Sequence, residues 1–124
     1  MRESEITALF DQWNNALQTG NPKAVVALYD TDAVLLPTLS NQVRHNHDEL
    51  EDYFRFFLAR GPQGKIEEAN VRILGEIAIN SGIYIFRFND GVVAPVRFTF
   101  VYRFNGQEWK IIEHHSSLMP EPID

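Results

Sequence analysis

Residues 97–104 alternate between aromatic and other side chains, and this pattern restricts the fold more than any other part of the sequence. The aromatic set is Phe98, Phe100, Tyr102 and Phe104, and the residues between them are Arg97, Thr99, Val101 and Arg103. A period of two places the two sets on opposite faces of a β-strand, and an aromatic face of this size must be covered. Segment 83–88 repeats the pattern, with Tyr84, Phe86 and Phe88 opposite Ile83, Ile85 and Arg87.

Glycine-containing turns near residues 75, 90 and 105 separate these segments and predict an antiparallel meander. In its last strand the same period places His114 and Ser116 on one face. The opposite face is expected to hold Trp109, Ile111, Glu113 and His115.

The first half of the chain predicts three amphipathic helices. Apolar residues recur at three- and four-residue steps over residues 6–17, and Asn21 with Pro22 is typical of the start of a second helix, running to Tyr29. Asn46 and Glu49 form a capping-box pattern for a third, whose apolar face, at the same spacing, holds Leu50, Tyr53, Phe54, Phe57 and Leu58. Short strands are expected at 33–36 and 42–45. The order of elements predicts one α+β domain over residues 1–124, with the three helices packed on one face of an antiparallel sheet.

Composition excludes several classes of function. The 124 residues carry a net charge of −6, which argues against nucleic acid or an anionic membrane as a partner. The chain has no cysteine, and therefore no disulfide, thiolate nucleophile or cysteine-based zinc site. No segment resembles a signal peptide or a membrane span, so we expect a cytoplasmic protein.

The outer face of the sheet is expected to pair with a second copy of the chain. Its apolar residues would otherwise form a contiguous patch in water, bordered by charged side chains. The expected homodimer interface comprises Ile83, Ile85, Arg87, Arg97, Val101, Arg103, Trp109, Ile111, Glu113 and His115.

Residues 16–21 and 26–37, together with the terminal meander, resemble the nuclear transport factor 2-like superfamily, which includes ketosteroid isomerase and the SnoaL-like proteins. The ending WKIIEHHSSLMPE, residues 109–121, resembles bacterial SgcJ/EcaC-type proteins related to the association domain of calcium/calmodulin-dependent protein kinase II. The resemblance implies a cone-shaped sheet with the helices on its concave face, and dimerisation through the sheet. It does not imply kinase activity, because the chain has no ATP-binding motif.

The resemblance also permits a test for isomerase chemistry. By alignment, the positions of the catalytic Asp, Tyr and protonated Asp of ketosteroid isomerase hold Leu36, Trp13 and Phe100. Those three roles are therefore lost. No cofactor is expected, and no metal, because His45 and His47 have no obvious third ligand.

The wide end of such a cone is often an apolar pocket, and we expect a small hydrophobic ligand there. The expected lining residues are Trp13, Tyr29, Tyr53, Tyr84, Phe100, Tyr102, His114 and Ser116. His114 is either satisfied by a neighbouring hydroxyl or in contact with the ligand.

Three functions fit the sequence. The first is a dimerising association-type domain with a ligand pocket. The second is an isomerase, dehydratase or cyclase that acts on a hydrophobic carbonyl or polyketide-like compound, with His114 as acid and base. The third is an accessory protein that holds an unstable metabolite for a neighbouring enzyme.

Overall fold

The three expected helices form, and two begin with the caps that the sequence indicates. The computed structural model describes residues 2–38 and 40–121. They contain α1 (Glu3–Gln18), α2 (Pro22–Val26) and α3 (His47–Leu58). The Asn21 side chain accepts a hydrogen bond from Lys23 N at 3.1 Å, and Asn46 accepts one from Glu49 N at 2.9 Å. Across the described ranges, no helix is long and apolar enough to cross a membrane.

Five strands form one sheet in the order β1-β5-β4-β3-β2. They are β1 (Tyr29–Leu36), β2 (Gln63–Leu74), β3 (Ile77–Arg87), β4 (Val93–Phe104) and β5 (Trp109–Leu118). The sheet is mixed, whereas an antiparallel sheet was predicted, because β1 returns from the helices and pairs parallel to β5. Tyr29 opens β1 instead of ending α2, and the expected strand at 42–45 is reduced to one bridge between Arg44 and Leu35.

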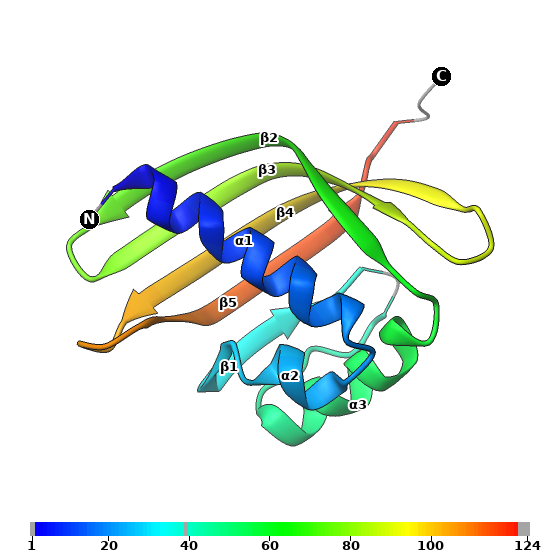
Figure 1. Cartoon of the computed structure of the whole chain (residues 1–124), viewed down its shortest axis with the longest axis horizontal. Coiled ribbons are helices and arrows are strands. Elements are labelled where there is room, and N and C mark those ends of the chain that lie inside the picture. Colours follow the sequence, from blue (N-terminus) through cyan, green and yellow to red (C-terminus); the bar gives the residue numbers. More distant parts are fainter. Residues whose placement is uncertain (1, 39, 122–124) are drawn as a thin grey trace.

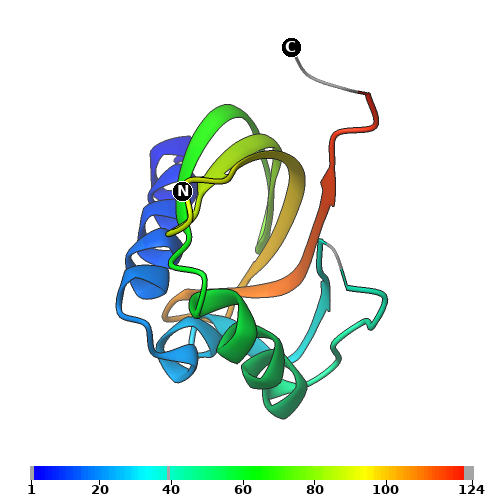
Figure 2. The ribbon, with the colours of Figure 1, turned by 90° about the vertical axis from the view of Figure 1, so that its right-hand side faces the viewer.

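The sheet curls around its aromatic face, and the helices cover that concave side. Figure 1 shows α1 lying across the strands, with α2 and α3 beside β1. Figure 2 shows that the sheet curves from β2 to β1 and that the helices lie on the concave side of this curve. The α+β architecture predicted from the order of elements is confirmed. The face toward α1 carries the buried aromatic residues Tyr84, Phe86, Phe98, Phe100 and Tyr102.

A bulge in β2 and a glycine in β3 allow a sharp bend where the two strands pair. The register of β2 shifts between Ile66 and Glu68, next to Gly82 of β3. A Cβ atom at Gly82 would lie 1.9 Å from the carbonyl oxygen of Glu68, so only glycine fits. A bulge opposite a glycine is a common way to curve a sheet, because the extra residue increases the local twist.

The Gly82→Ala substitution is therefore expected to lower the free energy of unfolding by about 1–3 kcal/mol, because backbone atoms must move to admit one methyl group. Denaturant unfolding monitored by tryptophan fluorescence measures this loss. Ser81→Ala, at the neighbouring position, is the control and should change stability by less than about 0.5 kcal/mol. Equal effects at the two positions would show that the close approach at Gly82 does not restrict the fold.

A second bulge, in β5, overturns part of the predicted outer face. Val101 pairs with Glu113 but Tyr102 pairs with Ile111, so β5 has one extra residue at Ile112. Residues of β5 that precede the bulge therefore point to the opposite face from the one that strict alternation predicts. Ile111 is buried at 2% exposure and Trp109 packs against the core, so their predicted outward orientation is wrong.

Candidate functional site

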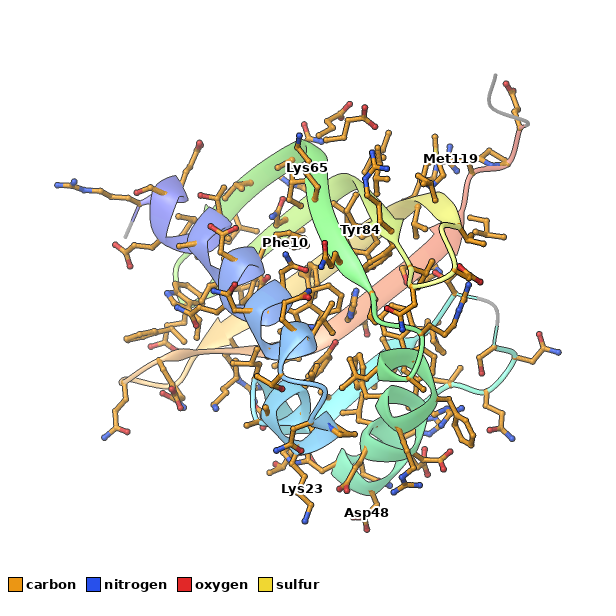
Figure 3. All side chains as sticks on the ribbon, turned by 45° about the vertical axis from the view of Figure 1, so that its right-hand side comes forward. Phe10, Lys23, Asp48, Lys65, Tyr84 and Met119 are labelled. Carbon is orange, nitrogen blue, oxygen red and sulfur yellow. The ribbon has the colours of Figure 1, made fainter. Side chains whose placement is uncertain are left out.

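The wide end of the curled sheet holds a cavity of about 380 Å³, a volume suited to a small organic molecule. Its walls come from α1, α3 and strands β1, β3, β4 and β5. The lining residues are Trp13, Leu35, Thr38, Tyr53, Phe54, Phe56, Phe57, Arg60, Tyr84, Phe86, Phe88, Val92, Ala94, Val96, His114, Ser116 and Leu118. Figure 3 shows Phe10 and Tyr84 inside the curl of the sheet, whereas Lys23 and Asp48 lie on the outer surface.

Aromatic side chains from α3 and β3 make up one wall of the cavity. Phe57 of α3 contacts Phe86 edge-on, with ring centroids 5.4 Å apart, and meets Phe88 in the same way at 6.0 Å. At the end of this wall, the guanidinium of Arg60 lies 3.9 Å above the Phe88 ring. Edge-on packing is a favourable arrangement for aromatic rings. Among the described lining residues, the only charged side chain is that of Arg60, at this end.

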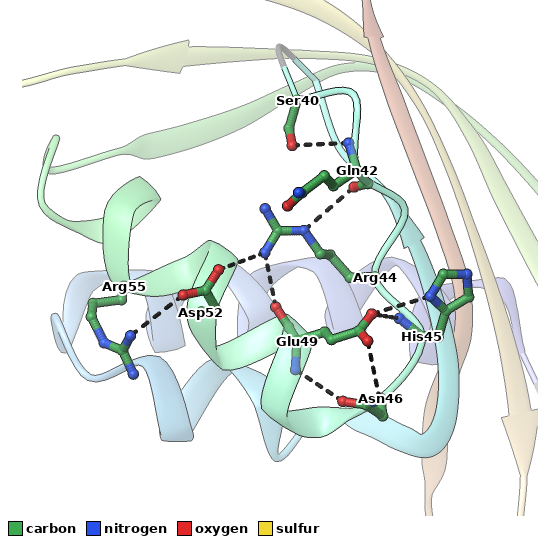
Figure 4. A network of polar contacts seen from close by, with 8 residues as sticks. All are labelled: Ser40, Gln42, Arg44, His45, Asn46, Glu49, Asp52 and Arg55. Atoms are coloured by element: carbon green, nitrogen blue, oxygen red, sulfur yellow. Dashed lines mark hydrogen bonds and ion pairs between the residues drawn. The ribbon is translucent and has the colours of Figure 1, made fainter.

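A polar network holds α3 in place behind that wall (Figure 4). Arg44 is mostly buried and donates to Asp52 Oδ2 at 3.0 Å and to the carbonyl oxygen of Glu49 at 3.1 Å. Its guanidinium also lies 5.5 Å from the ring centroid of Tyr53. The network fixes the helix that supplies Tyr53 and Phe54 to the cavity, because a buried guanidinium needs its partners.

The cavity floor is built around His114. Its Nδ1 lies 2.8 Å from the Tyr29 hydroxyl and its Nε2 lies 3.2 Å from the Tyr84 hydroxyl. Trp13 Nε1 donates to the Tyr29 hydroxyl at 3.2 Å. The Phe100 ring stacks on the imidazole, with centroids 4.0 Å apart. One histidine therefore connects α1, β1, β3 and β4 through hydrogen bonds and stacking.

Burial controls the protonation of these groups. It lowers the pKa of His114 to about 3, with a smaller lowering from His115, so the imidazole is neutral at physiological pH. Burial raises the pKa of Tyr84, partly offset by a hydrogen bond with Ser116, and raises the pKa of Tyr29 well above its usual value. The floor is uncharged, and both nitrogens of its histidine are already hydrogen-bonded. This arrangement suits hydrogen bonding to a ligand better than proton transfer.

The low pKa of His114 makes stability depend on pH. In the unfolded chain His114 has its ordinary pKa near 6.5, so below this pH the unfolded chain binds a proton that the folded chain does not bind. The free energy of unfolding therefore falls as pH drops from 6.5 toward 3. Between pH 7 and pH 5 the loss attributable to this group is about 2 kcal/mol. Urea unfolding at the two pH values measures it.

The His114→Gln variant should lack this part of the pH dependence, whatever its absolute stability. His115→Gln is the matched control, because His115 is the exposed neighbour on the opposite face, and it should keep most of the dependence. A pH profile that His114→Gln leaves unchanged would contradict a buried neutral imidazole.

Five of the eight predicted lining residues line the cavity: Trp13, Tyr53, Tyr84, His114 and Ser116. The prediction is wrong for Tyr29, Phe100 and Tyr102, which lie one layer behind the wall. Tyr29 bonds His114, Phe100 stacks on it, and Tyr102 stacks on Phe100 at 5.7 Å. These residues form a second layer because the sheet curves more tightly around them. The narrower space there is filled by side chains and leaves no room for a cavity.

Several lining residues were not predicted, although the sequence contained a signal for most of them. Phe54 and Phe57 lie on the apolar face already assigned to the third helix, and Phe86 and Phe88 on the aromatic face of 83–88. No such signal marks Thr38 or Arg60. Thr38 donates to Ser116 Oγ at 2.7 Å, a contact across 78 positions that only the folded chain forms.

His45 and His47 make separate contacts. His45 pairs with Glu49 at 3.1 Å, and His47 Nε2 donates to the carbonyl oxygens of Tyr29 and Asp30 at 2.9 and 3.1 Å. Over the described residues, no group of three or more histidine, aspartate or glutamate side chains is arranged to hold a metal ion.

The outer face of the sheet carries partly exposed apolar side chains. Ile83 and Ile85 lie there, and Ile79 lies opposite Val101 on the neighbouring strand. Arg87, Arg97 and Arg103 are exposed around them, as are Glu113 and His115. Arg103 forms an ion pair with Asp30 of β1 at 2.5 Å, and this partner holds the pKa of Asp30 below its usual value despite partial burial.

Comparison with known proteins identifies the family. The family model of the calcium/calmodulin-dependent protein kinase II association domain matches residues 2–120. The chain belongs to this family. An association domain of this type from Xanthomonas campestris has a solved structure with a TM-score of 0.95 and 45% identity, covering 98% of this chain and 91% of that one. The relation to the kinase II association domain that was expected from residues 109–121 is confirmed.

More distant solved structures share the fold of the association domain. A nuclear transport factor 2-like protein from Pseudomonas putida KT2440 has a TM-score of 0.82 and 20% identity, covering 98% of this chain and 87% of that one. A ketosteroid isomerase-like protein from Erwinia carotovora atroseptica has a TM-score of 0.75 and 20% identity, covering 98% and 100%. Among curated proteins, none matches the chain.

Proposed function

We propose that the chain is an association domain that pairs with a second copy of itself through the outer face of its sheet and binds a small hydrophobic molecule in its cavity. The membership of the association-domain family carries the first half of this proposal. The apolar outer face supports it, because partly exposed isoleucine and valine side chains on adjacent strands gain from being covered.

The cavity supports the second half. Its lining is aromatic and aliphatic apart from a small group of hydroxyls beside His114 and one arginine, which is the usual composition of a small-molecule site. A binding role is preferred to catalysis with His114 as acid and base. The histidine is neutral and hydrogen-bonded on both sides, and the carboxylates of isomerase chemistry are absent from the aligned positions.

The pairing half is tested by sedimentation equilibrium. The wild-type chain is expected to be a dimer at micromolar concentration. The double variant Ile83→Glu/Val101→Glu is expected to be a folded monomer, because two carboxylates introduced among apolar side chains would lose their water when the face is covered. Phe56→Glu is the control, since Phe56 is 70% exposed on α3, away from that face, and it should remain dimeric. A monomeric wild type would exclude the proposed pairing.

The binding half is tested with an apolar probe, 2-isopropylnaphthalene, by quenching of tryptophan fluorescence. Ala94→Phe places a ring inside the cavity and is expected to weaken binding by at least about tenfold. Val93→Phe is the matched control, because Val93 precedes Ala94 on β4 and points to the opposite face, and it should bind like the wild type. If both variants bind the probe as tightly as the wild type does, the probe binds elsewhere on the protein.

A further inference from the structure

The hydrogen bonds around His114 run in one direction, because they begin at a group that only donates. The indole nitrogen of Trp13 has a hydrogen and no free lone pair, so the Tyr29 hydroxyl accepts from it. Tyr29 is 1% exposed, and among the described residues its own hydrogen has one acceptor within reach, which is Nδ1 of His114 at 2.8 Å. Leaving that hydrogen unbonded in the core would be unfavourable.

This order fixes the tautomer of the histidine. Because Nδ1 accepts from Tyr29, the single hydrogen of the neutral imidazole must lie on Nε2. Nε2 lies 3.2 Å from the Tyr84 hydroxyl, so His114 donates and Tyr84 accepts. Trp13 therefore determines, through Tyr29 and His114, that the Tyr84 oxygen accepts a hydrogen bond from the His114 side chain.

The floor then has one hydrogen more than its own acceptors use. Four hydrogens belong to the connected groups, which are Trp13, Tyr29, His114 and Tyr84, and three hydrogen bonds join these groups in a line. Each hydrogen bond uses one hydrogen. The hydrogens of Trp13, Tyr29 and His114 are committed inside the core, so the remaining one lies on the Tyr84 hydroxyl, which lines the cavity.

The other two hydroxyls beside Tyr84, those of Thr38 and Ser116, bond each other, with their oxygens 2.7 Å apart. Tyr84 accepts from His114, so its own O–H is left to point into the cavity. The floor therefore offers a donor, and no side chain of the lining within residues 2–38 and 40–121 has a carboxylate or amide oxygen to accept it.

We infer that the cavity selects apolar molecules that end in a neutral hydrogen-bond acceptor, such as a ketone, ester or ether oxygen, placed against the Tyr84 hydroxyl. This inference rests on the proposed binding function. A neutral acceptor fits better than a carboxylate, because the lining around Tyr84 carries no charge and Arg60 lies near Phe88 at the other end of the wall. In this scheme Tyr84 contacts the ligand, while Trp13, Tyr29 and His114 are positioning residues.

Two probes of matched shape test the inference, 2-acetylnaphthalene and 2-isopropylnaphthalene, which differ by an oxygen in place of a methyl group. Their dissociation constants are measured by equilibrium dialysis for the wild type and for Tyr84→Phe. The variant is expected to weaken ketone binding by about threefold to tenfold, the usual effect of one net hydrogen bond, and to leave hydrocarbon binding unchanged or tighter. Tyr102→Phe is the control, because Tyr102 lies behind the wall and its hydroxyl has no hydrogen-bond partner among the described residues, and it should affect neither probe. Tyr53→Phe removes the other phenol of the lining and separates the two hydroxyls.

A second measurement concerns the positioning residues and begins with the wild type. Long-range proton–nitrogen NMR correlations of the wild type identify which nitrogen of His114 carries the hydrogen, and Nε2 is expected. In Tyr29→Phe, Nδ1 loses its donor, so the Nδ1–H tautomer should become populated and the preference for the ketone over the hydrocarbon should fall.

The outcomes separate the two proposals. If neither probe binds the wild type, the binding function fails and the inference fails with it. If both bind and Tyr84→Phe weakens them equally, or Tyr53→Phe weakens the ketone as much, the cavity binds small molecules but the donor is not at Tyr84. A hydrogen on Nδ1 of His114 in the wild type would also overturn the inference.

Discussion

The burial of one neutral imidazole determines much of the arrangement around it. His114 is 3% exposed, and the core tolerates it because tyrosine hydroxyls bond both ring nitrogens and the Phe100 ring covers one side. Each partner comes from a different element, so the helix α1 and strands β1, β3 and β4 must hold their relative positions to keep the histidine satisfied. The low pKa of His114 and the polarity of the cavity floor both follow from this arrangement.

The curvature of the sheet separates its two faces into different environments. Its concave side is crowded at the tight end, where Tyr102 and Phe100 stack, and open at the wide end, where α3 supplies the remaining wall of the cavity. Its convex side is left without a helix and keeps isoleucine and valine side chains partly exposed. A flat sheet would have no room for the cavity, because α1 would then lie at one packing distance along its whole length.

The sequence predicted the elements well and the details of the last strand poorly. The three-and-four spacing of α1 and α3 and the period of two in β3 and β4 gave elements of the right type in the right order, because each pattern repeats over several turns or residue pairs. Trp109 and Ile111 were assigned to the wrong face because one extra residue at Ile112 reverses the alternation, and nothing local in WKIIEH marks a bulge. Tyr29 was assigned to a helix because the parallel partner that draws it into β1 lies more than 80 residues away.

By itself, the sequence determined the α+β class, the aromatic inner face, the position of His114 on that face and the resemblance to the association-domain family. All of these depend on local periodicity or on a contiguous motif. The tertiary structure decided which aromatic residues line the cavity and which support it from behind, that Thr38 and Arg60 belong to the site, and which way the hydrogen bonds of the floor run. Those properties depend on contacts between residues far apart in the chain, such as Trp13 with Tyr29 and Tyr29 with His114, and such contacts exist only after the sheet has curled around α1.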